Sequence, residues 1–112
     1  MKNQRKILSR KNPGENKSKT LARMRQEILS SLPFAFEHQI EEAMCEFAII
    51  AEPAQLFTLA QKLSLTKKFE NCAIHCIARS GTGNALAWLK ARKNNATAQE
   101  AMEVWLLTPR EN

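Results

Sequence analysis

Three side chains that can bind a soft metal stand close together at Cys72, His75 and Cys76. Their i, i+3 and i+4 spacing brings all three to one face of a helix, and thiolate and imidazole are ligands that zinc accepts. Cys45 or His38 could supply a fourth ligand. However, no C-x2-C pair or second ligand pair accompanies them, and the positions fall on or beside an apolar stripe. We therefore predict ordinary core packing here, with a hydrogen-bonded histidine and no bound metal.

Carboxylates that could serve in acid–base catalysis are confined to one stretch. Glu41 and Glu42 are adjacent, Glu37 and Glu46 stand at i,i+4 offsets from them, and the chain has no Asp. This spacing is typical of a solvated helix face.

The two glycines of residues 80–83 follow an apparent helix and lack the Lys of a phosphate-binding loop, so they predict a helix end and a turn. We predict no catalytic residue, no cofactor and no enzymatic activity.

Positive charge is concentrated at the N-terminal end. Residues 1–25 hold nine of the 17 basic residues and a single acid, Glu15, whereas residues 26–61 hold six acids and no Lys or Arg. Residues 62–112 are mildly basic. A basic, apolar-poor segment of this kind is typical of proteins that engage a polyanion. The predicted nucleic-acid or polyanion ligands are Lys2, Arg5, Lys6, Arg10, Lys11, Lys17, Lys19, Arg23, Arg25, Lys67 and Lys68.

Apolar spacing predicts an all-α fold of five to six short helices, arranged as stacked helical hairpins or as a compact bundle. Residues 1–19 have scattered charge and an Asn-Pro-Gly turn, so we predict a flexible, disordered arm there and a single domain over residues 20–112. Both tryptophans are expected in the core. The expected helices are Thr20–Leu32, Phe36–Ala51, Pro53–Leu63, Thr66–Ser80, one from Asn84 with Lys90, Arg92 and Lys93 near its end, and Thr97–Leu107, with N-caps at Thr20, Thr66, Asn84 and Thr97.

An internal similarity relates two parts of the predicted domain. Residues 43–63 align without gaps on residues 73–93, and most apolar positions match. Either a duplication of a 30-residue helical hairpin or the pattern that all amphipathic helices share explains this match. The second copy, from Ala73 to Leu89, resembles the helix pair of an ankyrin repeat, with His75, a spaced alanine and Gly81 at the turn. That resemblance covers 17 residues and implies stacked helical hairpins.

A second resemblance concerns residues 60–66. Their small residue, apolar residue, tight link and hydroxyl N-cap are similar to the turn of a DNA-binding helix-turn-helix. The sequence departs from that family at Ser64, where Gly is usual, and at Glu70, where an apolar residue is expected. The resemblance implies that Lys67, Lys68 and Asn71 would face the bases of a DNA duplex.

The chain also shows where the protein is expected to act. Its longest all-apolar run, residues 47–51, is far shorter than the ~20 residues of a membrane span. The first eleven residues lack the apolar core of a secretory signal, and three cysteines without an export signal indicate a reducing compartment. We therefore expect no membrane partner and a cytoplasmic location, or a nuclear one in a eukaryotic cell.

The predicted function is that of a small non-enzymatic binding or regulatory protein whose basic N-terminal arm engages nucleic acid or a nucleoprotein. RNA and DNA fit this expectation equally well. One alternative is a protein–protein interaction module or inhibitor, adaptor-like and of phage or plasmid origin. A further alternative is a helix-turn-helix DNA-binding regulator.

Overall fold

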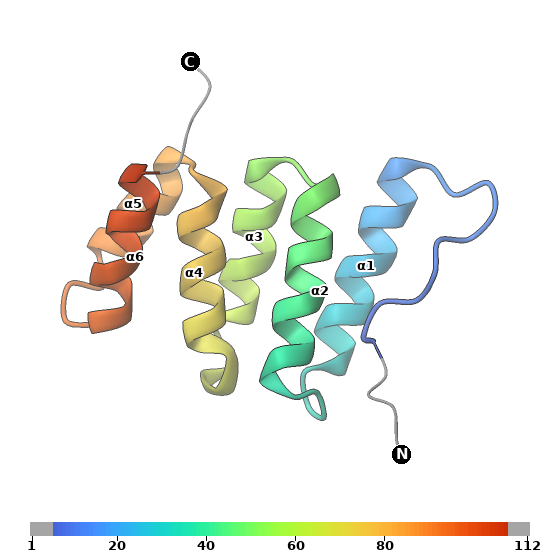
Figure 1. Cartoon of the computed structure of the whole chain (residues 1–112), viewed down its shortest axis with the longest axis horizontal. Helices are drawn as coiled ribbons and strands as arrows, with labels where there is room; N and C mark the ends of the chain where they lie inside the picture. The colour runs from blue at the N-terminus through green and yellow to red at the C-terminus, as the bar shows by residue number, and fades with distance from the viewer. Residues whose placement is uncertain (1–5, 108–112) are drawn as a thin grey trace. The chain divides into compact units, whose positions relative to one another are not determined.

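The computed structural model of the chain describes residues 6–107, and every regular element in that range is helical (Figure 1). The all-α prediction is confirmed. Among the described helices, none is long and apolar enough to cross a membrane. In chain order the elements are α1 (Lys17–Ser31), α2 (Glu37–Ile50), α3 (Pro53–Leu63), the short 3-10 turn η1 (Lys67–Phe69), α4 (Glu70–Ser80), α5 (Gly83–Lys90) and α6 (Ala96–Leu107).

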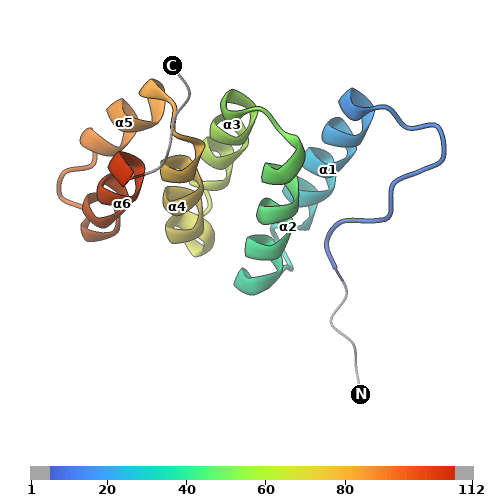
Figure 2. The same cartoon turned by 45° about the horizontal axis from the view of Figure 1, so that its top comes forward.

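The chain divides into two compact units, Met1–Ala51 and Glu52–Asn112. In the first unit α1 and α2 pack against each other as a helical hairpin. In the second unit α4 is the central helix and contacts α3, α5 and α6 (Figure 2). We predicted one domain over residues 20–112. The described helices of that range fall into two compact units, and a single domain stays a prediction.

The first unit is built on the apolar stripes of its two helices. Met24 and Ile28 of α1, with Ile40 and Phe47 of α2, are buried, as their spacing predicts. The predicted helix Phe36–Ala51 would place Phe36 on the same stripe as Ile40 and Phe47, and this prediction was wrong. It is the N-cap residue of α2 and has an extended backbone, so its ring leaves the stripe and is 61% exposed.

Helix α1 begins earlier than we predicted. The carboxamide of Asn16 caps the helix, because its Oδ1 accepts the backbone N–H of Lys19 at 2.8 Å. Thr20, which we predicted as the cap, lies inside the helix, where its side chain is buried and donates to Glu15. Lys17 and Lys19 are therefore helical residues and do not belong to an arm.

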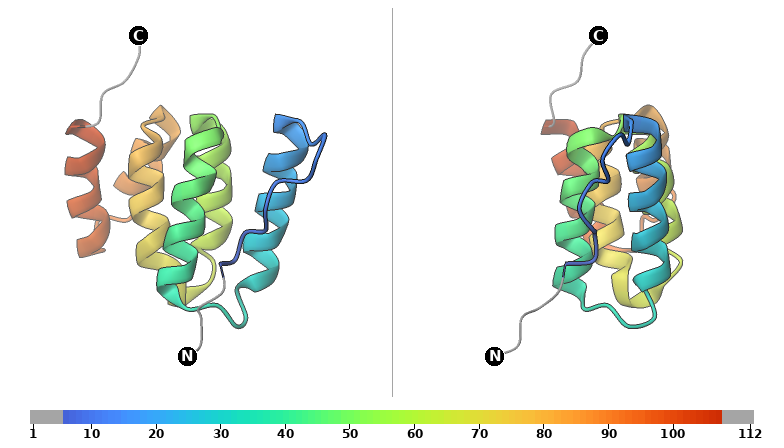
Figure 3. Two further views of the ribbon diagram at one scale, coloured as in Figure 1. Left: turned by 45° about the vertical axis from the view of Figure 1, so that its right-hand side comes forward. Right: turned by 90° about the vertical axis from the view of Figure 1, so that its right-hand side faces the viewer.

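The segment before α1 differs from the disordered arm that we predicted. Residues 6–16 turn at Gly14, which has a φ of 77°, and run along α1, with Leu8 buried (Figure 3). Hydrogen bonds to α1 compensate for the loss of chain entropy in this segment. Residues 1–5, which include Lys2 and Arg5, lie outside the described residues.

In the second unit, the predicted helix starts differ from the structure to different degrees. Thr66 is the N-cap residue of η1, as predicted, but its side chain makes no capping hydrogen bond and α4 itself begins only at Glu70. Thr82, not Asn84, caps α5 by accepting the backbone N–H of Ala85 at 3.0 Å. Asn95 takes the place of Thr97 at the start of α6 and accepts the backbone N–H of Ala98. Several residue types cap equally well, so composition alone does not choose among neighbours.

Other expectations for the second unit are confirmed. Gly81 ends α4 in the left-handed conformation, with a φ of 69°, as the glycine pair predicts. Trp105 is buried, and its Nε1 donates to the carbonyl of Thr82 at 2.8 Å.

Trp88 is only half-buried, so placing it in the core was wrong. The guanidinium carbon of Arg92 lies 3.3 Å from the centroid of that ring.

The helix bounds agree with the 30-residue similarity. Helices α2 and α4 end at residues 50 and 80, and α3 and α5 begin at residues 53 and 83. Ala43 and Phe47 are buried in the first copy, as Ala73 and Ile77 are in the second. Duplication itself stays a prediction.

Candidate polyanion-binding surface

Arg23 is the centre of a hydrogen-bonded network that joins the N-terminal segment to α1. Its Nε donates to Oε2 of Glu15 at 2.8 Å, and its Nη2 donates to Oε1 of the same carboxylate at 3.1 Å. Its Nη1 donates to Oε1 of Glu27 at 3.0 Å and to the carbonyl and hydroxyl oxygens of Ser9. The Ser9 hydroxyl in turn donates to Oε2 of Glu27 at 2.6 Å. One guanidinium group therefore donates hydrogen bonds to three residues, Ser9, Glu15 and Glu27.

The network shifts the titration of its members. The hydrogen bond from Arg23 lowers the pKa of Glu15 from its ordinary value of 4.5 to about 2, assisted by bonds from Thr20 and the backbone of Asn12 and opposed by desolvation. The bond to Glu15 likewise raises the pKa of Arg23, with smaller contributions from Glu27. Both groups therefore carry full charge near neutral pH.

This network divides the predicted cationic ligands into two groups. The side chain of Arg23 is only 16% exposed and is held by two carboxylates, so it is engaged inside the unit. Arg10, Lys11, Lys19 and Arg25 are exposed, and none of them pairs with an acid among the described residues. The only acids of residues 6–31 are Glu15 and Glu27, and Arg23 holds both carboxylates, while its single positive charge balances one of their two negative charges. Within residues 6–107, neither carboxylate forms an ion pair with Arg10, Lys11, Lys19 or Arg25.

The first turn of α1 adds to this surface. Lys17 and Lys19 lie there, both are exposed, and no acidic residue occupies the turn. The helix macrodipole disfavours cations at this end by about 0.3–1 kcal/mol. Their placement runs against local preference and is compatible with an external anion.

Lys6 lies at the other end of the segment. Its Nζ is 3.4 Å from Oε2 of Glu46, and its side chain is 62% exposed. Exposed ion pairs contribute about 0–1 kcal/mol and are screened by salt. A phosphate group can therefore replace Glu46 as the partner of Lys6 at little cost.

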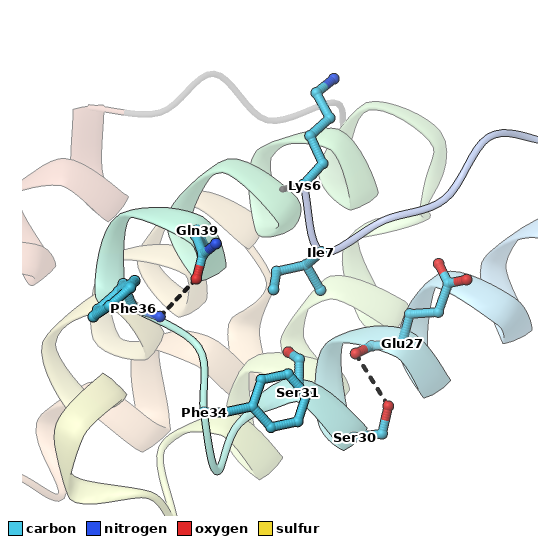
Figure 4. A pocket seen from close by; sticks show the side chains of 8 residues that line it. All are labelled: Lys6, Ile7, Glu27, Ser30, Ser31, Phe34, Phe36 and Gln39. Carbon is cyan, nitrogen blue, oxygen red and sulfur yellow. Dashed lines mark hydrogen bonds between the residues drawn. The ribbon is translucent and has the colours of Figure 1, made fainter. Parts of the chain in front are cut away.

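Beside Lys6 the first unit has a cleft of about 390 Å³ (Figure 4). Ile7 reaches into it from the N-terminal segment, the ring of Phe34 lies beside Ser31, and Lys6 points away from its centre. The complete lining is Lys6, Ile7, Glu27, Ser30, Ser31, Phe34, Phe36 and Gln39. Sequence reasoning missed this cleft, although two phenylalanines on either side of a single alanine, directly after Pro33, were a signal.

Lys67 and Lys68 belong to the second unit. Both are exposed on η1, and Nζ of Lys68 lies 5.3 Å from the centroid of the Phe69 ring. In a helix-turn-helix the base-reading side chains start the second helix, whereas here these cations precede α4. Asn71 is exposed in the first turn of α4. The position of the two lysines suits contact with phosphate better than contact with bases.

Cys72, His75 and Cys76 do not share one environment. Cys72 is buried, Cys76 is half-buried and His75 is exposed. Core packing is confirmed for Cys72 and was wrong for His75, which lies on the solvent side of α4. Over residues 6–107, no group of three His, Cys, Asp or Glu side chains is arranged to hold a metal ion.

Comparison with known proteins gives no match to this chain, whether among protein-family models, curated proteins or solved structures.

Proposed function

We propose that the protein binds nucleic acid, alone or in a nucleoprotein, through the cationic surface formed by Arg10, Lys11, Lys17, Lys19 and Arg25. The observation that carries this proposal is the Arg23 network. It holds the two acids of residues 6–31, while Arg10, Lys11, Lys19 and Arg25 are exposed on the same compact unit and pair with no acid among residues 6–107. A phosphate backbone carries closely spaced negative charges, about one per 1.7 Å of duplex axis, so it can engage several of these cations at once.

The physical effect of this surface is long-range attraction. Each cation that neutralises a phosphate releases condensed counterions, so affinity falls steeply as the salt concentration rises. The salt slope, which is the slope of log K against log salt concentration, is about −0.9 per phosphate contact for a duplex and about −0.7 for a single strand. Contacts of this kind position the nucleic acid and read no sequence. The protein then acts as a binding or regulatory protein and catalyses no reaction.

The experiment compares two fourfold variants by fluorescence anisotropy with labelled RNA and DNA over a range of salt concentrations. The test variant carries Arg10→Gln, Lys11→Gln, Lys19→Gln and Arg25→Gln. We expect its affinity to fall by orders of magnitude at ~100 mM salt, and its salt slope to fall by about 3, close to the value for four lost phosphate contacts.

The control variant removes the same charge from the second unit by Lys62→Gln, Arg79→Gln, Lys90→Gln and Lys93→Gln, all of which are exposed. We expect a much smaller loss in this control. Equal losses in the two variants would assign binding to net charge and not to this surface. No measurable binding by the native protein would overturn the proposal.

A protein partner is the second candidate, and one observation favours it. Leu65 is 85% exposed beside a cleft of about 330 Å³ that Thr58, Gln61, Lys62 and Trp88 also line. An exposed aliphatic side chain next to a half-buried tryptophan is typical of a site where an apolar side chain of another protein inserts. Loss of pull-down partners in Leu65→Ser, with nucleic-acid affinity unchanged, would support this second function.

A further inference from the structure

The loop between α1 and α2 presents two aromatic rings to solvent. Phe34 is 73% exposed and Phe36 is 61% exposed, although Ala35 between them is buried. The loop is well fixed, because the N–H groups of Phe34 and Ala35 donate to the carbonyl of Ser31 at 3.0 and 2.9 Å. Oε1 of Gln39 accepts the N–H of Phe36 at 2.8 Å. The rings are therefore held on a defined backbone and pay little entropy when they bind.

The second ring extends into a stacked pair. Phe36 and His38 have ring centroids 6.0 Å apart and planes only 6° from parallel. Both side chains are exposed. Exposing this much aromatic surface costs free energy that burial against a partner would recover. A flat aromatic ligand could stack on these rings through its π-face.

The cleft between these rings and α1 has the polarity of a nucleotide site. The rings and Ile7 supply apolar walls, and Ser30 and Ser31 supply hydroxyl groups. Glu27 also lines the cleft, but its carboxylate is already bonded to Ser9 and Arg23. The carboxylate of Glu27 is thus held by a cation of its own unit, which it shares with Glu15.

A stripe of α1 connects the cleft to the cationic surface. Lys19, Gln26 and Ser30 stand at i, i+7 and i+11, so they lie along one side of the helix. Ser30 lines the cleft, and Lys19 belongs to the cationic surface. At 1.5 Å per residue these two positions are roughly 16 Å apart, which a strand of a few nucleotides spans.

We propose that the cleft accepts an unpaired nucleobase, stacked on Phe34 or Phe36, so that the ligand is single-stranded nucleic acid. This inference rests on the proposed function and names its substrate class. In a duplex the bases are stacked on each other and their faces are closed to side chains, whereas single strands offer them freely. Cations along α1 hold the phosphates, and the rings hold the base.

The test compares three probes of about 12 nucleotides, within the site sizes of single-strand binders. One is a pyrimidine single strand, one has the same length and charge but abasic positions, and one is a duplex hairpin. The native protein should bind the base-containing strand on the order of tenfold or more tighter than the abasic strand, since stacking of this kind changes affinity by about 5- to 150-fold per base.

The variant Phe34→Ala/Phe36→Ala should lose that difference and keep its affinity for the abasic strand. Both rings are exposed, so the variant should keep its helical circular dichroism signal. The matched control is Ile49→Ala/Leu107→Ala, which removes apolar side chains that are 82% and 84% exposed elsewhere. The control should retain the preference for bases.

Each other outcome is decisive. Equal affinity of the native protein for base-containing and abasic strands, with strong salt dependence, would overturn the stacking site and leave the proposed function intact. Absence of binding to every probe would overturn both. Unchanged nucleic-acid affinities in Phe34→Ala/Phe36→Ala, together with loss of a concentration-dependent dimer in sedimentation, would assign the rings to a second copy of the chain and overturn the nucleobase site.

Discussion

Arg23 of α1 holds Glu15 of the preceding segment through two hydrogen bonds of 2.8 and 3.1 Å, from Nε and from one terminal nitrogen. In this pair the segment contributes the acid and the helix contributes the cation, whereas the composition suggests that the basic segment would contribute the cation. A basic arm would be expected to dock through its cations onto the acidic face of α2, and Lys6 with Glu46 is one such contact. The segment is also fastened by its single acid to a cation of the helix, and its cations Arg10 and Lys11 stay exposed.

The first prediction concerns the pH dependence of this pair. The pKa of Glu15 is lowered from 4.5 to about 2, chiefly by the hydrogen bond from Arg23. A carboxyl with a depressed folded-state pKa adds stability that is present above its unfolded-state value of 4.5 and is lost as the pH falls toward 2. The stability difference between the native protein and Glu15→Gln should be constant well above pH 4.5 and shrink as the pH falls from 4.5 toward 2. Urea unfolding at several pH values measures this difference, and a difference that does not change with pH would contradict it.

The second prediction concerns release of the segment. In Arg23→Gln, Glu15 and Glu27 lose their shared partner, so residues 6–16 should detach from α1 while the helix remains. Trypsin cleavage after Arg10 and Lys11 should accelerate by about tenfold, because hydrogen bonds to charged groups contribute about 1.5–3 kcal/mol. The control is Arg25→Gln, which removes the same charge from an exposed position without an ion pair among residues 6–107. Equal acceleration in both variants would show that charge alone governs cleavage.

The core was predictable from the sequence because it depends on local periodicity. The spacing of Ile40, Ala43 and Phe47 places them on one side of a helix whatever packs there, and all three are buried. The Glu15–Arg23 pair was not predictable, because the start of α1 lies between the two residues and helical spacing does not relate them. Phe36 was misplaced for a related reason: the stripe assumes helical backbone, and a cap residue is extended.

The candidate site was predictable only in part. Composition identifies every cation of residues 6–25, but it does not separate Arg23, which is engaged, from Arg25, which is exposed. That separation depends on which side of α1 the preceding segment covers. The cleft at Phe34 could be predicted only from the path of the same segment, because Ile7 of that segment forms one wall of the cleft.

The third prediction tests which residue caps α5. Thr82 accepts the N–H of Ala85, whereas Asn84 is exposed inside the first turn. Thr82→Ala should lower the free energy of unfolding by about 1 kcal/mol, and Asn84→Ala should leave it unchanged or raise it slightly. Thermal or urea unfolding measures both. The reverse order would show that Asn84 is the cap, as the sequence had predicted.

The fourth prediction concerns metal. Because Cys72 is buried and His75 is exposed, their side chains lie in different environments. Protein purified without added zinc should contain substoichiometric metal by elemental analysis, and a chelator should leave its thermal melt unchanged. A structural zinc site would contribute on the order of 10 kcal/mol to folding, so chelation would unfold the domain. One equivalent of zinc per chain, lost with the helical signal in Cys76→Ser, would contradict the prediction.

The fifth prediction distinguishes phosphate contact from base reading at Lys67 and Lys68. Both cations lie on η1, before the helix that a helix-turn-helix would insert into the major groove. In Lys67→Gln/Lys68→Gln, duplex affinity should fall about equally on every DNA sequence, and the salt slope should fall by about 1.8 for two lost phosphate contacts. Anisotropy on a panel of duplexes of different sequence measures both effects, with Lys90→Gln/Lys93→Gln as the control of equal charge. A preference for one duplex in the native protein that disappears in Lys68→Ala would instead support the helix-turn-helix reading, because only contact with base edges carries sequence information.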